Sequence, residues 1–397
     1  MHSISLLEKW CQRNAVIGHQ SRLGAILRVV SALLDGGSLA LTHLGRHRPG
    51  QAFVKHHIKA VDRLLGNQHL HRERHGFYAA FARTVLSAVQ NPLIVVDWAD
   101  CELDREMLIL RAAVPAAGRA VTVYEEVHPL SRYNSPKTHR AFLNALHHIV
   151  PAHLTPVIVT DAGFRGPWFR QVEALGWHWI GRIRNTIKYF KPETGRWCYV
   201  HSLYPEATPK VRHIGQRVLS KRHRYTCRLY LLRAYQSRVG RHPGRKSYGT
   251  NDALYRKLHR APWLLATSLP HTRNSAKAVV RAYQQRMQIE EAFRDLKNHR
   301  WGFGLRYARS RNTQRLEVLL LIALLATLLL WLHGLAAKAK QWTRHFQANT
   351  ERKRTVLSIP FLGQALWRST RFKLSRLELH QAFADLQNLV SNEAQFA

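Results

Sequence analysis

The sequence has 397 residues, 46% of them hydrophobic, and its 61 Lys and Arg residues against 24 Asp and Glu residues give a formal net charge of +37. This length and apolar content exclude a chain that is disordered throughout, and they predict two or three domains with a sizeable core. The basic excess is spread along the chain and exceeds what solubility requires. It therefore predicts a polyanionic partner, nucleic acid in preference to anionic lipid.

The first 90 residues are predicted to be helical. Apolar residues recur with a period near 3.6 in 21–34, 53–65 and 77–89. Turn or surface chemistry separates these stretches at Gly36-Gly37 and in the charged run 71–74. We interpret 1–90 as a helical DNA-binding domain, with a helical oligomerisation module as the alternative. The beginning of the chain lacks the uninterrupted apolar core of a secretory signal, so we expect a cytoplasmic, nucleoid-associated protein.

After Asn91-Pro92 the pattern changes to short apolar runs of strand length, separated by helix and turn signals. Strands that alternate with helices after an initial hairpin predict a mixed α/β sheet covered by helices. This region, 91–183, is the predicted first part of a core domain. Its expected strands are 93–96, 107–114, 120–124, 157–160 and 177–183, its expected helices are 137–150 and 168–175, and Ala116-Ala117-Gly118 is the hairpin turn.

Beyond residue 183 this alternation stops and later resumes. Residues 184–262 are rich in Arg, Lys, His and Tyr, with a β-like run at 225–233, and we interpret them as an inserted β-rich subdomain. A strand at 263–268 and a long helix at 276–299 then belong to the second part of the core, 263–335. The last segment, 336–397, is predicted to be helical and to serve DNA contacts or dimerisation.

Three carboxylates stand out in this arrangement. Asp97 and Asp161 each follow a run of β-branched residues, and ligands gather at strand ends in α/β sheets. An acid in that place is also common as a turn residue or helix cap. On the helix 276–299, Glu290 shares a stripe of roughly 60° with the three residues Tyr283, Arg286 and Lys297. Glu291 points about 100° away, which selects Glu290 as the inward acid.

The alternative interpretation of this stripe is a solvent-exposed polar helix face with side-chain pairs such as Arg286 with Glu290. That alternative explains the charges but not their combination with two strand-end acids. Three hard oxygen ligands suit Mg²⁺, with Mn²⁺ as a substitute. Two such ions about 3.5 to 4 Å apart support in-line attack on phosphorus, and Tyr283, Arg286 and Lys297 would hold backbone phosphates.

The run 318–337 has no acidic, Lys or Arg side chain and is about as long as a membrane span. Glu317 adjoins one end, His333 and Gly334 interrupt the other, and no second span accompanies it. A helix buried on all sides of a large protein has the same pattern. We expect the buried helix and no membrane.

The motifs VVDWAD, VTDAGF and Y-x2-R-x3-E-x6-K, the last formed by Tyr283, Arg286, Glu290 and Lys297, resemble the DDE transposases of the bacterial insertion-sequence-four family. The stretch 55–67, KHHIKAVDRLLGN, is similar to the N-terminal region of members close to the transposon-ten type. The resemblance thus extends over most of the chain.

The resemblance implies an RNase H-like catalytic core with a β-rich insertion between the second Asp and the Glu, and cut-and-paste transposition. It assigns the metal ligands to Asp97, Asp161 and Glu290 and the phosphate contacts to Tyr283, Arg286 and Lys297. It also implies that Trp263, on the strand after the insertion, stacks on a base flipped out during hairpin formation; an ordinary core position is the alternative.

The expected protein is therefore a homodimeric transposase acting on double-stranded DNA. Its first substrate would be the terminal inverted repeats of its own element, which it would nick, convert to hairpins and reopen. Its second substrate would be the target DNA, into which it would insert the element. The alternative from another class is a DNA-binding protein with an inactive site, which acts only as an end-binding repressor.

Overall fold

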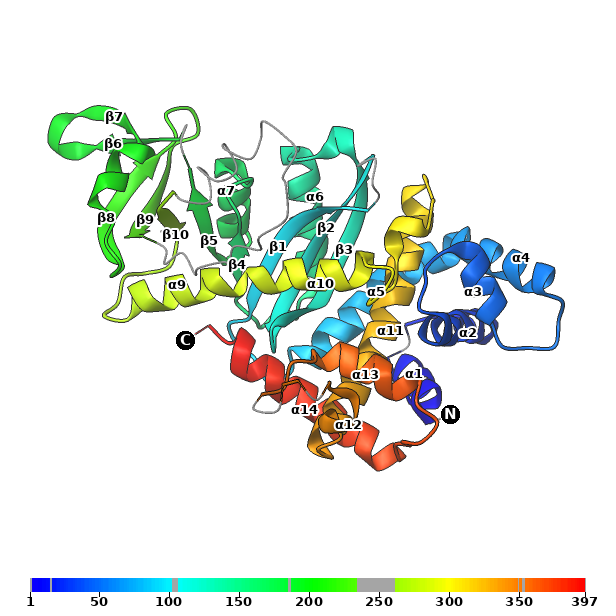
Figure 1. Ribbon diagram of the computed structural model, residues 1–397. Helices are drawn as coiled ribbons and strands as arrows, with labels where there is room; N and C mark the ends of the chain where they lie inside the picture. Colours follow the sequence, from blue (N-terminus) through cyan, green and yellow to red (C-terminus); the bar gives the residue numbers. More distant parts are fainter. Residues whose placement is uncertain are drawn as a thin grey trace, which may run out of the picture. The chain divides into compact units, whose positions relative to one another are not determined.

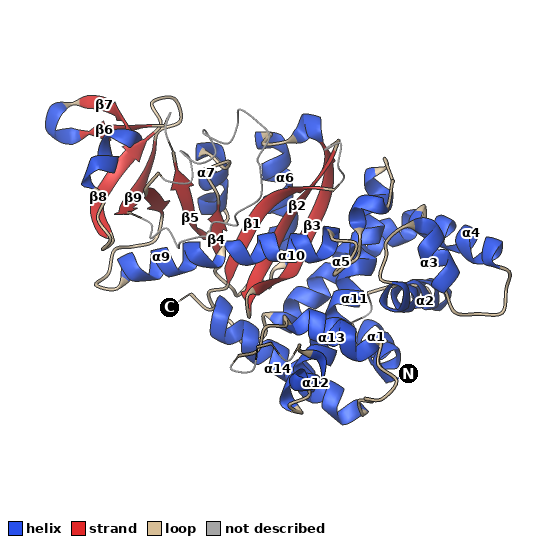
Figure 2. Cartoon of the chain, in the orientation of Figure 1, coloured by secondary structure: helices blue, strands red, loops and turns tan. Residues whose placement is uncertain are grey.

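The computed structural model describes residues 2–14, 16–101, 106–184, 187–233, 261–348, 350–351 and 354–396. The chain divides into two compact units. The first combines Met1–Thr155 with Met287–Gln395, and the second comprises Pro156–Arg286 with the last two residues. Figures 1 and 2 show that both units contain helices and strands. The predicted mixed α/β class is confirmed.

The described part of the N-terminal region is helical, as predicted, and it contains five helices. One predicted break is wrong: residues 71–74 lie inside the fifth helix. Its first turn is capped by Asn67, whose Oδ1 accepts the N–H of Leu70 at 2.9 Å. The charged residues that resembled a surface break instead make tertiary ion pairs, among them Glu73 with Arg22 at 2.7 Å. The helices are α1 (His2–Arg13), α2 (Gln20–Gly36), α3 (Leu41–His47), α4 (Val54–Leu65) and α5 (Gln68–Val85).

Three antiparallel strands form the sheet of the first unit: β1 (Leu93–Asp100), β2 (Met107–Ala116) and β3 (Arg119–Pro129). The predicted turn between β2 and β3 is present, with positive φ at Ala117 (47°) and Gly118 (77°). β1 is longer than predicted. It continues past Asp97 because Asp100 still pairs with Leu108 of β2, so the prediction that the strand ends at Asp97 is wrong.

Helices cover both faces of these three strands. On one face the Phe142 ring of α6 (Pro136–Ile149) packs on Tyr124 of β3, with centroids 5.2 Å apart. On the other face α10 (Met287–Lys297) runs across the strands (Figure 1), and its Phe293 ring lies 4.5 Å from the Arg111 guanidinium of β2. The remaining α-helices of this unit are α11 (Thr313–Ala339), α12 (Thr343–Phe346), α13 (Ile359–Trp367) and α14 (Arg376–Ala394).

The long apolar run lies in α11, which belongs to the core of the first unit. Among the described residues, α11 is the only individual helix that is long and apolar enough to cross a membrane. Inside the protein, 94% of its most apolar 18-residue stretch is buried. The bent pair α2 and α3 passes the same test only when the two are counted as one span. The burial of α11 agrees with the predicted core helix.

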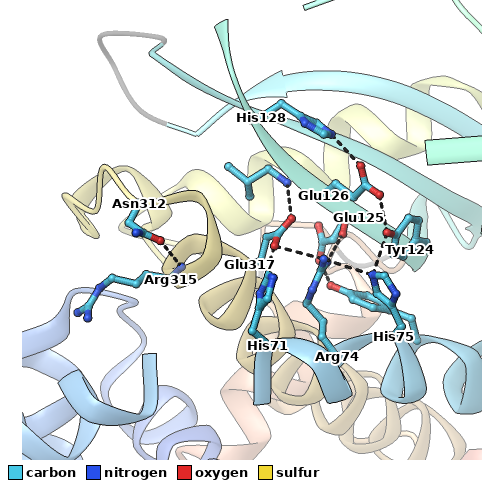
Figure 3. A network of polar contacts seen from close by, with 12 residues as sticks. His71, Arg74, His75, Tyr124, Glu125, Glu126, His128, Asn312, Arg315 and Glu317 are labelled. Carbon is cyan, nitrogen blue, oxygen red and sulfur yellow. Dashed lines mark hydrogen bonds and ion pairs between the residues drawn. The ribbon is translucent and has the colours of Figure 1, made fainter. Parts of the chain in front are cut away.

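At the outer edge of β3, charged side chains bind the backbone groups that a further strand would otherwise pair with (Figure 3). Arg74 of α5 donates to the carbonyl oxygen of Glu125 at 2.8 Å, and Glu317 of α11 accepts the N–H of Val127 at 3.2 Å. Arg74 and Glu317 are themselves an ion pair at 3.2 Å. An unpaired strand edge exposes backbone donors and acceptors. Here the buried pair Arg74 and Glu317 binds two backbone groups of the β3 edge and connects α5 and α11 to the sheet.

In the second unit the strand order is β4-β5-β10-β9-β8-β6-β7. β4 and β5 are parallel and are connected through α7, whereas the other pairs are antiparallel. The predicted strands 157–160, 177–183, 225–233 and 263–268 are all present within a residue of their expected bounds. The elements are β4 (Val157–Thr160), α7 (Gly166–Ala174), β5 (His178–Ile183), β6 (Lys188–Lys191), β7 (Arg196–Tyr199), β8 (Arg212–Leu219), β9 (Tyr225–Leu232), β10 (Trp263–Thr267) and α9 (Ser275–Gln285).

Four short 3-10 helices complete the described secondary structure. They are η1 (Leu130–Arg132), η2 (Pro192–Thr194), η3 (Val200–Glu206) and η4 (Leu305–Tyr307). Part of the predicted β-rich segment, residues 234–260, lies outside the described residues.

The single helix predicted over 276–299 is two helices, α9 and α10, and this prediction is wrong. Arg286 separates them: its backbone is still helical, but its N–H bonds to the carbonyl of Tyr283, three residues back, at 3.2 Å. This tighter bond interrupts the regular i to i−4 pattern. The two compact units also meet in the sequence at this point.

Candidate active site

Asp97 lies in the middle of β1, half-buried, with its Oδ1 accepting the N–H of Trp98 at 2.8 Å. Across the ladder it is directly opposite Arg111 of β2. Directly paired residues in an antiparallel sheet place their side chains on the same face. Because Arg111 lies against Phe293 of α10, the Asp97 side chain is on the face that α10 covers.

The helix α10 presents Glu290 toward the same strand. Glu290 and Lys297 are seven residues apart, which is almost two full turns, so they share one stripe of the helix. Lys297 forms an ion pair with Asp100 of β1 at 3.2 Å. The stripe that holds Glu290 therefore faces β1.

Glu291 lies on a different stripe, as the helix geometry predicts. Its carboxylate pairs with Arg294 at 2.6 Å and lies 3.7 Å from Arg119 at the β2–β3 turn. Asp295, one turn further on, pairs with the same Arg119 at 2.6 Å. These contacts hold Glu291 in a structural ion-pair group and support the choice of Glu290 over Glu291.

Asp100 lies on the same strand as the candidate acid Asp97, and the sequence analysis quoted it within its motif but did not single it out. Besides Lys297 it binds Arg306, with 3.0 Å between Nη2 and Oδ2. Burial is the largest influence on the pKa of Asp100 and raises it, but Lys297, a backbone hydrogen bond and Arg306 together outweigh burial and hold the pKa below its usual value. A second acid three residues after Asp97 was the available signal.

Trp98, the residue next to Asp97, is held by contacts on the other face of β1. The indole N–H of Trp98 donates to Nε2 of His139 on α6 at 3.2 Å, and the Trp98 ring also packs against His128 and Tyr133. Burial, with His128 nearby, lowers the pKa of His139 to about 4. His139 is thus neutral at pH 7 and able to accept this hydrogen bond, which holds β1 in place behind Asp97.

In the second unit Asp161 directly follows β4. Its Oδ1 accepts the N–H of Gly163 at 2.7 Å. This turn, in which the side chain bonds the backbone two residues later, is one that Asp commonly forms. It orients the half-buried carboxylate at the end of the strand, where the sequence predicts it.

Tyr283 of α9 is the centre of a second group in the same unit. Its ring packs edge-on against Trp263 of β10, with 5.0 Å between centroids, and the Arg286 guanidinium lies 5.9 Å from it. Arg182 of β5 hydrogen-bonds with the Tyr283 side chain. Burial, the largest influence, raises the pKa of Tyr283, and Asp161 adds to the rise while Arg286 and Arg182 oppose it. Tyr283 is therefore a neutral phenol near Asp161.

Arg182 was missed by the sequence analysis. It is a buried cation, 6% exposed, in a strand whose other residues apart from His178 are apolar, and it also donates to the carbonyl of Ala261 at 3.0 Å. Burial lowers the pKa of Arg182. A charged residue in the mostly apolar run 179–183 was the signal, because Arg is rarely buried without a partner.

The predicted site residues are thus divided between the two units. The first contains Asp97, Glu290 and Lys297, and the second contains Asp161, Trp263, Tyr283 and Arg286. Within the ranges that the structure describes, no three His, Cys, Asp or Glu side chains form a group that could hold a metal ion.

Residues 128–329, just over half of the chain, match the family described as the transposase DDE domain. The chain belongs to this transposase family. The match includes Asp161, Trp263 and Glu290 and begins after Asp97. No curated protein matches the chain.

Membership makes the protein a DDE transposase, a polynucleotidyl transferase that acts on DNA. The mixed α/β architecture is compatible with an RNase H-like DDE domain. DDE transposases generally use divalent metal ions. Carboxylate oxygens are ligands that such ions prefer, and Asp97, Asp161 and Glu290 are half-buried carboxylates on or next to ordered strands and a helix.

Proposed function

We propose that this transposase moves an insertion sequence by a cut-and-paste reaction at its terminal inverted repeats. Within the DDE transposases we assign it to the bacterial insertion-sequence-four family, close to the transposon-ten type. The observation that carries the proposal is the α10 stripe, where Glu290 and Lys297 face the strand of Asp97 and Asp100. A solvated helix face would not direct its acid toward a strand that carries two more acids.

Asp97, Asp161 and Glu290 are the proposed ligands of Mg²⁺, with Mn²⁺ as a substitute. Bound metal would activate the attacking oxygen and stabilise the leaving oxygen in phosphoryl transfer. The protein groups around the acids orient them: the N–H groups of Trp98 and Gly163 each hold one carboxylate oxygen. Oriented carboxylates lose less conformational freedom when a ligand binds.

Tyr283, Arg286 and Lys297 are the proposed contacts for DNA phosphates. Arg offers a planar fork that matches a phosphate, and Lys a point charge. In the DNA-free protein Lys297 is bound to Asp100, so a phosphate would exchange with that carboxylate. Arg182 hydrogen-bonds with the Tyr283 side chain and so helps to hold that one member of the set.

Trp263 is the proposed stacking partner for a base flipped out during hairpin formation. It is half-buried, and its ring already packs edge-on against Tyr283. This contact fixes the indole and is also what an ordinary core position would have. Extruding a base costs a few kcal/mol, part of which an aromatic platform offsets.

The proposed organisation follows the predicted segments, with residues 1–90 as the DNA-binding domain, 184–262 as a β-rich insertion in the RNase H-like core, and 336–397 for DNA contacts or dimerisation. Two subunits would bring the two transposon ends together in a homodimeric synaptic complex. We expect the protein in the cytoplasm, associated with the nucleoid.

The test is a cleavage assay on labelled DNA that carries the element's inverted repeat and flanking sequence. With Mg²⁺, the wild-type protein should first nick one strand and then yield a hairpin end, visible on a denaturing gel. Asp161→Asn should bind the DNA and produce neither. Double-strand breaks that never pass through a hairpin would contradict the proposed pathway, and cutting by Asp161→Asn would contradict the proposed site.

A further inference from the structure

The segment after α10, residues 298–312, carries exposed aromatic and basic side chains on a tightly bonded backbone, and we call it the aromatic loop. Four of its fifteen residues are Arg, and it contains neither Asp nor Glu. Trp301 is 60% exposed and Tyr307 is 49% exposed. Large aromatic rings are usually buried, so two on one short loop need an explanation.

Hydrogen bonds within the loop and to α10 fix the backbone of its first part. Asn298 Oδ1 accepts the N–H groups of Arg300 and Trp301 at 2.7 and 3.1 Å, and the carbonyl of Asp295 accepts the N–H of Phe303 at 3.1 Å. Gly302 is required there, because a Cβ would lie 1.5 Å from the Asp295 oxygen. The loop is therefore a preformed platform, and ordering it on binding costs little.

Buried and exposed residues divide sharply along the loop. Gly302, Phe303, Gly304 and Leu305 are buried and anchor it, whereas the aromatic and charged residues on either side point outward. Trp301 makes an edge-on contact with Phe361 of α13 at 5.8 Å but stays largely exposed. The outward set is Arg300, Trp301, Arg306, Tyr307, Arg309 and Arg311.

The loop is also tied to the strand of the candidate active site. Arg306 bonds Asp100, which Lys297 of α10 also bonds, and Asp100 is three residues from Asp97 on β1. All these residues belong to the first unit. DNA that reaches Asp97 and Glu290 thus approaches a surface with four guanidinium groups and two exposed rings.

We propose that the aromatic loop binds unpaired bases of DNA beside the cleaved end, with Trp301 and Tyr307 stacking on bases and the arginines holding the backbone. This rests on the proposed function, since it places the loop at the same DNA end. Exposed rings together with basic side chains are the features that bind single strands, because every unpaired base offers a stacking face. Paired bases in a duplex keep those faces covered.

The test measures fluorescence anisotropy with two DNA probes that share one inverted-repeat end, one fully paired and one forked with unpaired bases. EDTA removes divalent metal, so no cleavage occurs. Trp301→Ala should weaken binding to the forked probe by roughly 5- to 150-fold, the range expected for one lost base stack, with little change for the paired probe. Trp301→Phe should retain most of the affinity.

Two further variants complete the design. Tyr307 does not take part in the contact with Phe361 of α13. A selective loss of forked-DNA binding by Tyr307→Ala therefore cannot result from a disturbance of α13. Tyr199→Ala removes a comparably exposed ring, 46%, from the second unit and should bind both probes normally. Unchanged forked-DNA binding by both loop variants, or equal loss for both probes, would overturn the proposal.

The result of this binding test can be distinguished from the result of the cleavage test of the proposed function. Normal cleavage by Asp161→Asn would overturn the carboxylate assignment and leave the binding result unaffected. Normal forked-DNA binding by Trp301→Ala and Tyr307→Ala would overturn the role of the loop and leave the cleavage result unaffected.

Discussion

At the scale of single residues, the adjacent acids Glu290 and Glu291 make a matched pair for mutation. Glu290 shares its stripe with Lys297, which binds Asp100 of β1, whereas Glu291 pairs with Arg119 and Arg294. Glu290→Gln should abolish strand cleavage in Mg²⁺ and leave DNA binding intact. Glu291→Gln should cleave within about twofold of the wild-type rate, because part-exposed ion pairs contribute little.

The comparison needs equal amounts of folded protein, which circular dichroism and DNA affinity establish for both variants. Normal cutting by Glu290→Gln together with loss of cutting by Glu291→Gln would show that the helix-face assignment is wrong.

His139 gives a prediction about pH. Its pKa of about 4 in the folded protein lies below the value of 6.5 for an exposed histidine. As the pH falls from about 6.5 to about 4, the unfolded chain takes up a proton that the folded chain does not, so the free energy of unfolding should fall by up to about 3 kcal/mol. Above pH 6.5 this contribution is fully present.

Denaturant unfolding at pH 7 and pH 5 measures the effect. His139→Gln keeps an acceptor for the Trp98 N–H but has no titrating group, so its stability should fall less between the two pH values than that of the wild type. Equal losses in the two proteins would show that His139 does not titrate as inferred.

Some site residues could be predicted from sequence and others could not, for a physical reason. Asp161 follows an apolar run whose local pattern is enough to define β4. Arg111 and Arg182 are different, because each is buried beside a partner that is distant in the sequence: Arg111 beside Phe293, and Arg182 beside Tyr283. Local periodicity carries no information about such contacts.

At the scale of elements, the packing of α11 against α13 depends on glycine. A Cβ on Gly334 of α11 would lie 1.9 Å from the carbonyl oxygen of Ile359. Gly334→Ala should therefore force the helices apart and lower the free energy of unfolding by about 1 to 3 kcal/mol.

Gly24 of α2 is the matched control. A Cβ there would meet only the Arg28 side chain, at 3.5 Å, so Gly24→Ala should be neutral or stabilise the protein by up to about 1 kcal/mol through helix propensity. Thermal and denaturant unfolding of the two variants measures the difference. Similar stability changes would mean that the close helix contact is not required.

The elements that differ from prediction also have identifiable causes. β1 extends to Asp100 because pairing with β2 continues through a polar stretch. Within α5, Glu73 pairs with Arg22 and Arg74 pairs with Glu317, so two residues of the charged run make tertiary contacts. The break between α9 and α10 has no Gly or Pro to signal it. For β1 and α5, contacts with residues outside the local segment override the local sequence pattern.

At the scale of the whole molecule, the chain divides into two compact units that each contain part of the proposed site. The net charge of +37 fits the DNA partner that family membership implies. The proposed triad has Asp97 and Glu290 in the first unit and Asp161 in the second. The central claim is therefore that Asp97, Asp161 and Glu290 act as one site.

The most direct test is the rate of first-strand cleavage in Mg²⁺ by Asp161→Asn, Glu290→Gln and the double variant, which removes one acid from each unit. Residues that act as one site are not additive in their effects. Each single variant should lose at least about a thousandfold in rate, and the double variant should be no slower than either, with DNA binding unchanged. Near-wild-type cleavage by either single variant, or losses that multiply in the double variant, would contradict a single carboxylate site.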